Sequence, residues 1–153
     1  MTREVRYREV RAEEVPARSR QAAEDAVRFA ATHLGITRPE VRWFVDCPTT
    51  AGEAFASLAN AMSPGPPVGS FEEDAAILGR TASDELVWLR ADLGARRTAE
   101  VAMHETLHVY QHRLVGPAQG SLEYDGREAQ ARGYETDLRE IARAIANSTT
   151  EGA

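Results

Sequence analysis

Two histidines four residues apart, with a glutamate directly after the first, are the clearest chemical signal in this sequence. They are His104, Glu105 and His108, in the run HETLH. Residues four apart lie on one face of an α-helix, about one turn from each other, so two imidazoles at this spacing can bind one zinc ion. Glu105 would lie beside the metal without being a ligand, where it can accept a proton from zinc-bound water. The spacing therefore predicts a zinc site with Glu105 as the general base.

The same pattern also allows a structural interpretation. Two histidines four apart can be hydrogen-bonded residues of an amphipathic helix, and a five-residue pattern also arises by chance. A helix over Thr98 to Leu114 is expected in either case, because apolar side chains recur at helical steps: Met103, Leu107, Tyr110 and Leu114. The choice between the two interpretations depends on a third ligand.

A hydrolytic zinc site takes three protein ligands and a water molecule. Geometry argues against His112 as the third, because His104 and His112 would lie ~12 Å apart along one helix. An acid on the next predicted helix, Arg127 to Asn147, is the better candidate. Glu128 stands twenty residues after His108 on this helix.

Glu135 is a rival to Glu128, because it lies two turns further along nearly the same helical stripe. Both acids also have a partner four residues on, Arg132 for Glu128 and Arg139 for Glu135, so each fits a solvated salt bridge as well. The two glutamates are too far apart, ~10 Å by helical rise, to bind one ion together. The residues alone leave this choice open.

In HETLH and the acid that follows it, the sequence resembles the gluzincins, the thermolysin-like zinc metallopeptidases. Their third ligand is a glutamate on the next helix, at about the distance of Glu128. One run is similar to the E-x-[EQ]-A-x-x-[FY] pattern of small intracellular gluzincins related to phage-repressor-cleaving peptidases: Glu128, Gln130, Ala131 and Tyr134. Those proteins have Asn or Asp at the position of Arg132 and a small residue at that of Glu135, so the match to this subfamily is partial. The resemblance covers roughly Ala75 to Ile145.

The resemblance implies a zinc metallopeptidase in which His104, His108 and Glu128 hold Zn²⁺ and peptides or proteins are the substrate. Glu105 would take a proton from the zinc-bound water and return it to the leaving amine. One alternative is a catalytically silent zincin-like module that binds or regulates a partner. Another is an unrelated helical domain in which HETLH is accidental.

Three further side chains are candidates for roles around the metal. Tyr124 and His112 could stabilise an oxyanion, and so could Tyr110, although Tyr110 fits the core better. If Glu135 is not a ligand, it could orient one of the histidines. Spacing does not choose among these roles.

The elements that must position these residues indicate an α+β fold, a minimal zincin-like domain with about three main helices, one short helix and a sheet of three or four strands. A helix is expected from Ala12 until Gly35 ends it. The other expected elements are a strand over Glu40 to Asp46, a short helix over Ala51 to Met62 and a hairpin of Asp74 to Ala82 with Glu85 to Leu93.

Three segments have roles that the patterns leave open or only suggest. The N-terminal residues 1–11 form either an edge strand or a loose arm. The resemblance implies that Glu85 to Leu93 pairs with the substrate backbone along the cleft; an ordinary internal strand is the alternative. The tail Ser148 to Ala153 should fray.

Composition limits the remaining possibilities. A chain of 153 residues is most simply one domain, and its net charge of −6 does not favour nucleic-acid binding. All 18 basic residues are arginine, which suggests a GC-rich bacterial or phage genome. Cys47 is the single cysteine, and neither a signal peptide nor a membrane-spanning run is evident, so a cytoplasmic protein is expected. The sequence does not indicate an oligomeric state.

Overall fold

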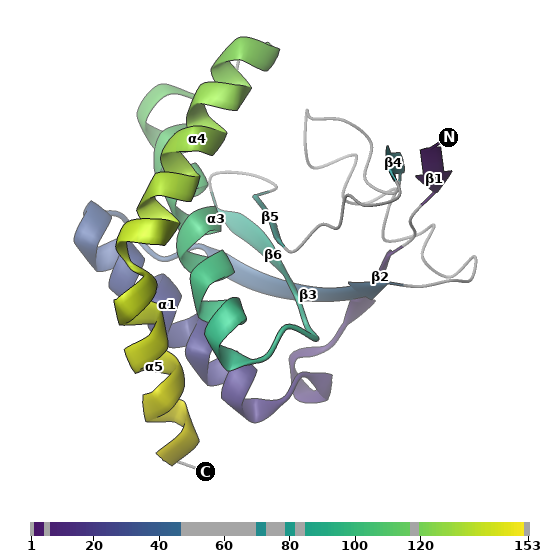
Figure 1. Cartoon of the computed structure of the whole chain (residues 1–153), viewed down its shortest axis with the longest axis vertical. Coiled ribbons are helices and arrows are strands. Elements are labelled where there is room, and N and C mark those ends of the chain that lie inside the picture. Colours follow the sequence, from purple (N-terminus) through teal and green to yellow (C-terminus); the bar gives the residue numbers. More distant parts are fainter. Residues whose placement is uncertain are drawn as a thin grey trace.

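The computed structural model describes residues 2–4, 7–46, 70–72, 79–81, 85–116 and 120–151. Within these residues, helices and a mixed sheet form an α+β fold, as predicted. The helices are α1 (Ala17–Leu34), α3 (Ala95–Val115), α4 (Ser121–Asp137) and α5 (Arg139–Glu151), preceded by a short 3-10 helix, Ala12–Glu14. Helix α3 lies in the middle of the molecule, and α4 and α5 follow each other along one side of it (Figure 1).

The main sheet has four strands in the order β2 (Tyr7–Val10), β3 (Glu40–Asp46), β6 (Leu86–Arg90) and β5 (Gly79–Thr81). Strands β3 and β6 are parallel, and the other two pairs are antiparallel. This arrangement confirms the strand at Glu40–Asp46 and, for the N-terminal segment, the edge-strand alternative. It also shows the antiparallel pairing expected of the predicted hairpin, between β5 and β6. A separate pair joins β1 (Thr2–Glu4) to β4 (Ser70–Glu72).

Strand β6 lies inside the sheet rather than along a cleft. Its central residues Val87, Trp88 and Leu89 are at most 1% exposed, and it is hydrogen-bonded to β3 on one side and β5 on the other. The expectation that Glu85 to Leu93 pairs with the substrate is therefore wrong, because the backbone of β6 already pairs with a strand on each side. Among the described strands, β5 is the one at this edge of the sheet.

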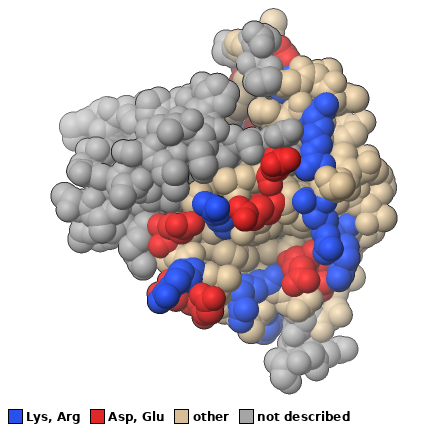
Figure 2. Space-filling model, turned by 180° about the vertical axis from the view of Figure 1, so that it is seen from behind, with Lys and Arg blue, Asp and Glu red and all other residues tan. Residues whose placement is uncertain are grey.

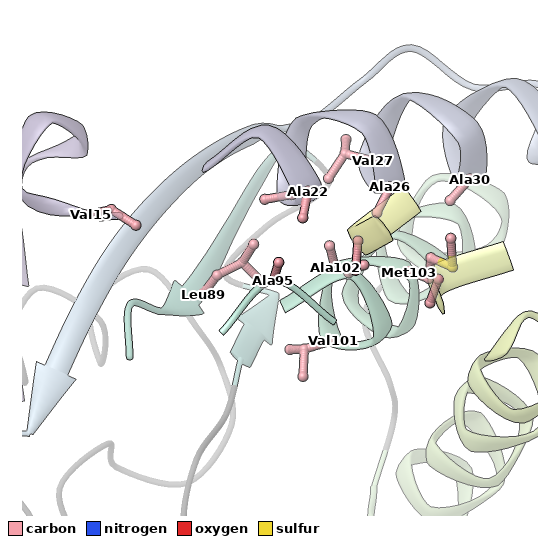
Figure 3. Close-up of a cluster of buried hydrophobic side chains, with 14 of the residues drawn as sticks. Val15, Ala22, Ala26, Val27, Ala30, Leu89, Ala95, Val101, Ala102 and Met103 are labelled. Atoms are coloured by element: carbon pink, nitrogen blue, oxygen red, sulfur yellow. The ribbon is translucent and has the colours of Figure 1, made fainter. Parts of the chain in front are cut away.

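Small side chains fix the position of α3 in the core. Ala22, Ala26 and Ala30 of α1 face Ala102 and its neighbours on α3 (Figure 3), and all four alanines are fully buried. Because alanine carries only a methyl group, the two helix backbones can lie close together. A larger side chain at such a contact would push the backbones apart. The packing of α1 against α3 therefore helps to fix the position of the polar residues that α3 carries.

The start of α1 was predicted five residues too early, but its end is as expected. Ala12 begins the short 3-10 helix, and Pro16 is the N-cap of α1. Gly35 closes α1 with φ of 72°, a left-handed conformation that glycine adopts without strain.

The C-terminal helical region is longer than predicted and is interrupted. It was expected as one helix over Arg127 to Asn147, but it begins at Ser121, continues to Glu151 and is broken at Leu138. Leu138 has φ of −98° and ψ of 10°, and it is 8% exposed. The break places Leu138, together with Ala142 of α5, in the hydrophobic core. Helix α5 thus includes the first four residues of the tail Ser148 to Ala153.

Acidic and basic side chains are interspersed over the rear face (Figure 2), rather than separated into areas of one sign. No helix in the described part of the chain is both long enough and apolar enough to cross a bilayer. The helix expected over Ala51 to Met62, and Cys47 with it, lie outside the described residues.

Candidate metal centre

The HETLH run lies in the middle of α3, where the helix is surrounded by other elements. Its neighbours are α1, α4, α5 and strands β5 and β6. His104 is 9% exposed and Glu105 is 6% exposed, whereas His108 is only partly buried. Polar side chains at such depth require hydrogen-bond partners, because burying an unpaired polar group has a large free-energy cost. The partners of these three residues come from α3 itself, α4 and β5.

Glu128 of α4 faces both histidines. Its two carboxylate oxygens lie 2.7 Å from Nε2 of His104 and 3.0 Å from Nε2 of His108. The two rings, whose centroids are 5.0 Å apart, therefore present the same nitrogen atom to one carboxylate. Ligand atoms from the three residues lie within 4.8 Å of one another, which makes them a candidate metal-binding group.

Glu135 lies on the other side of His104. Its carboxylate is 3.4 Å from Nδ1 of that ring and 3.3 Å from the Arg97 guanidinium. Glu135 therefore contacts Nδ1 of His104, whereas Glu128 contacts Nε2 of the same ring. The rival third ligand of the sequence analysis is placed to orient a histidine instead.

His108 has a different outer partner. Its Nδ1 lies 2.8 Å from the amide oxygen of Gln111, a residue that is 5% exposed. The Gln111 amide nitrogen donates to the backbone oxygen of Arg127 at 3.2 Å and to the side-chain oxygen of Gln130 at 2.9 Å. These contacts connect α3 to α4 beside Glu128.

The close contacts change the proton affinities of the four groups. Burial by itself would lower the pKa of His104, but hydrogen bonds to Glu128 and Glu135 outweigh it and raise that pKa to about 10. The pKa of His108 is likewise raised, against the effect of burial, by its hydrogen bond to Glu128 and the charge of Glu105. Hydrogen bonds from both histidines hold the pKa of the Glu128 carboxyl well below its usual value. For Glu135, burial favours the neutral acid, but His104 and Arg97 lower its pKa.

A residue of the sheet holds the Glu105 side chain by a hydrogen bond. The Thr81 hydroxyl, on β5, lies 2.8 Å from a carboxylate oxygen of Glu105 and 3.0 Å from its backbone oxygen. Burial raises the pKa of the Glu105 carboxyl, and the charges of His108 and His104 oppose this shift. The neighbouring Gly79 leaves room for this contact, since a Cβ there would lie 3.0 Å from Cγ of Glu105.

The arrangement fits a zinc ion in its chemistry. Two imidazole nitrogens and one carboxylate are a ligand set found in hydrolytic zinc sites. The same Nε2 atom of each ring faces the carboxylate, and each Nδ1 has an oxygen partner, which is the usual outer contact of a zinc-bound histidine. Zinc bound here would replace the protons that the histidines now direct at Glu128.

His112 and Tyr124 are not part of the ligand group. His112 is in the last turn of α3 and is partly buried, and Tyr124 is 53% exposed one turn before Glu128 on α4. Neither position assigns the residue a role with an oxyanion. Tyr110, expected in the core, is only partly buried.

Two contacting residues, Gln111 and Thr81, were not predicted. Gln111 stands three residues after His108, a spacing at which helical side chains meet, so the i, i+3 rule could have identified it. No local pattern identifies Thr81, because its contact with Glu105 depends on how β5 packs against α3.

Comparisons with models of protein families, with curated proteins and with solved structures find no match to this chain. The residues of the site and their geometry are therefore the basis for assigning a function.

Proposed function

We propose that this protein is a zinc-dependent metallopeptidase. The observation that carries the proposal is the convergence of His104, His108 and Glu128 next to the buried carboxylate of Glu105. Two histidines with a glutamate would leave a fourth position of the zinc ion for water. Two helices contribute ligands to this centre, and a strand holds the acid beside it, so the arrangement does not depend on the HETLH pattern alone.

Each residue has a defined part in hydrolysis. His104, His108 and Glu128 would hold Zn²⁺, which supplies a water molecule of lowered pKa and polarises the scissile carbonyl. Glu105 would accept the proton of that water and deliver it to the leaving amine. Thr81 keeps the Glu105 carboxylate in place through its hydroxyl group. The raised pKa of the Glu105 carboxyl makes its carboxylate a stronger base toward the proton of that water.

The position of the edge strand β5 favours a peptide as the substrate. Strand β5 is the outermost described strand on the side of α3, and its residues Gly79 and Thr81 are adjacent to Glu105. An extended peptide can add to a sheet edge by backbone hydrogen bonds. A substrate paired with β5 would pass beside the general base, so β5 would take the role that the resemblance implied for Glu85 to Leu93.

The test is the variant Glu105→Gln. It should retain zinc and stability but lose hydrolysis of a broad peptide library, because Glu105 acts on water and is not a ligand. Glu24→Gln, an exposed substitution of the same type on α1, is the matched control and should keep full activity. Zinc content, thermal unfolding and cleavage would be measured on all three proteins.

Two other results would reject the proposal in different ways. Wild-type protein that binds zinc but cleaves no peptide, and whose Glu105→Gln variant behaves identically, would be a binding or regulatory module. Well-folded protein without affinity for zinc would make HETLH accidental.

A further inference from the structure

Gln111 connects the two helices of the metal centre through three side-chain contacts. It is buried on α3, one turn after His108, and it contacts three groups on two helices: Nδ1 of His108, the backbone oxygen of Arg127 and the side-chain oxygen of Gln130. This inference rests on the proposed zinc site and concerns what prepares that site for metal.

The orientation of the Gln111 amide follows from its partners. A backbone carbonyl only accepts hydrogen bonds, so the amide nitrogen of Gln111 must face the oxygen of Arg127. Its second hydrogen is directed at Gln130, and the amide oxygen then faces Nδ1 of His108. Because that oxygen only accepts, Nδ1 must carry a proton. Nε2 is thereby left as the nitrogen that can bind a metal, and it is the one that faces Glu128.

The same side chain also fixes α4. Arg127 immediately precedes Glu128, so Gln111 contacts a ligand on α3 and the backbone beside a ligand on α4. Hydrophobic packing supplies little restraint there: the residues from Leu122 to Gln130 are exposed or half-buried, and Ala131 is the first fully buried one. The polar contacts of Gln111 are thus a main connection of this part of α4 to the rest of the protein.

We propose that Gln111 is a positioning residue that selects the metal-binding nitrogen of His108 and holds Glu128 at coordination distance from it. It does not bind the metal, since all of its polar atoms are engaged on the outer side of the His108 ring. Gln130 assists by accepting the second amide hydrogen. Zinc affinity and coordination geometry therefore depend on an amide that touches neither metal nor substrate.

Two variants separate the two roles of Gln111. Gln111→Leu removes every polar contact at similar volume, whereas Gln111→Glu keeps an acceptor for His108 but cannot donate to Arg127. Gln21→Leu, at an exposed glutamine of α1, is the matched control. Zinc affinity would be measured by competition with a chelator, the site geometry by the visible absorption of the Co²⁺-substituted protein, and the fold by unfolding without metal.

We expect zinc binding to weaken by about 10- to 100-fold in Gln111→Leu, the usual effect of losing an outer partner of a ligand, with an altered Co²⁺ spectrum. Gln111→Glu should weaken it less, and the control should match wild type. If Gln111→Leu does not fold, Gln111→Glu and Gln130→Leu, at an exposed position, decide the question: weakened affinity supports the proposal, and wild-type affinity in both rejects it.

A folded Gln111→Leu protein with wild-type zinc affinity and an unchanged Co²⁺ spectrum would overturn the role of Gln111 and leave the proposed function standing. Wild-type protein that binds neither zinc nor Co²⁺ would overturn both.

Discussion

Glu135 and Glu128 contact opposite nitrogens of one imidazole, that of His104. Glu128 lies 2.7 Å from Nε2, and Glu135 lies 3.4 Å from Nδ1. The His104 ring is therefore held between two carboxylates, of which only the first also reaches His108. This relationship distinguishes a candidate ligand from a residue that orients a ligand.

Glutamine substitutions at the two acids should separate these roles. Glu128→Gln replaces a ligand and should reduce zinc affinity by more than the about 10- to 100-fold expected for an outer contact, whereas Glu135→Gln should cause at most that smaller loss. Chelator competition on the two variants side by side measures the difference. Loss of zinc in the Glu135 variant alone would reverse the assignment.

Thr81→Val should impair catalysis without affecting the metal. The substitution keeps the shape of the side chain and removes the hydroxyl that contacts Glu105. A hydrogen bond to a charged group contributes about 1.5–3 kcal/mol, so kcat/KM should fall by roughly 10- to 100-fold. Thr32→Val, at an exposed site on α1, is the control. Equal kcat/KM for Thr81→Val and wild type would show that Glu105 needs no such support.

Gly79→Ala should destabilise the protein and disturb Glu105. A Cβ at this position would lie 2.6 Å from Cγ1 of Val101 and 3.0 Å from Cγ of Glu105, so neighbouring atoms must move. Overpacking of this kind costs about 1–3 kcal/mol, which urea unfolding can measure.

The control for that substitution is Gly126→Ala. Gly126 lies within α4 and has open space around it, so alanine should stabilise the helix by roughly 0.5–1 kcal/mol. A Gly79→Ala protein as stable as wild type would contradict the close packing of β5 against α3.

Zinc binding should release protons and strengthen with rising pH. In the protein without zinc, burial acts to lower the pKa of His104, but Glu128 and Glu135 raise it to about 10, so the ring is protonated at neutral pH. Zinc must displace that proton, whereas Glu128, whose pKa is lowered, is already ionised. Zinc affinity should rise by up to about tenfold per pH unit for each proton displaced, until the pH reaches the pKa of His104.

Calorimetric titration at pH 7.5 in buffers of different ionisation enthalpy counts these protons. His33→Gln, which changes an exposed histidine of α1, should leave the number unchanged. Zinc uptake without proton release would mean that the histidines are neutral before binding or are not ligands.

The parts of the structure that could be predicted are those specified by local pattern. Alternation of apolar residues located the strand Glu40–Asp46 with its observed bounds, and Gly35 marked the end of α1. Helical spacing located α3 within three residues at its start and one at its end. These features depend on neighbours a few residues apart, which a single sequence contains.

What could not be predicted depends on packing between distant segments. Leu138 interrupts a continuous helical pattern that has neither proline nor glycine at that point, because burying Leu138 and Ala142 in the core favours a bend. The spacing left Glu128 and Glu135 as rival ligands, because their distances from the histidines depend on how α4 crosses α3. The contact between Thr81 and Glu105 likewise exists only once β5 lies against the helix.

The contiguity of the site along the chain has a consequence for how the protein folds. All the groups described around HETLH lie between Gly79 and Glu135, so their contacts are short in sequence; His108 and Glu128, for example, are 20 residues apart. By contrast, β3 and β6 pair residues that are far apart in the sequence, such as Glu40 with Leu86. Short-range contacts form faster because less chain entropy is lost on closure. We therefore expect α3 and α4 to bring the ligands together early, and the N-terminal half of the chain to dock against them afterwards.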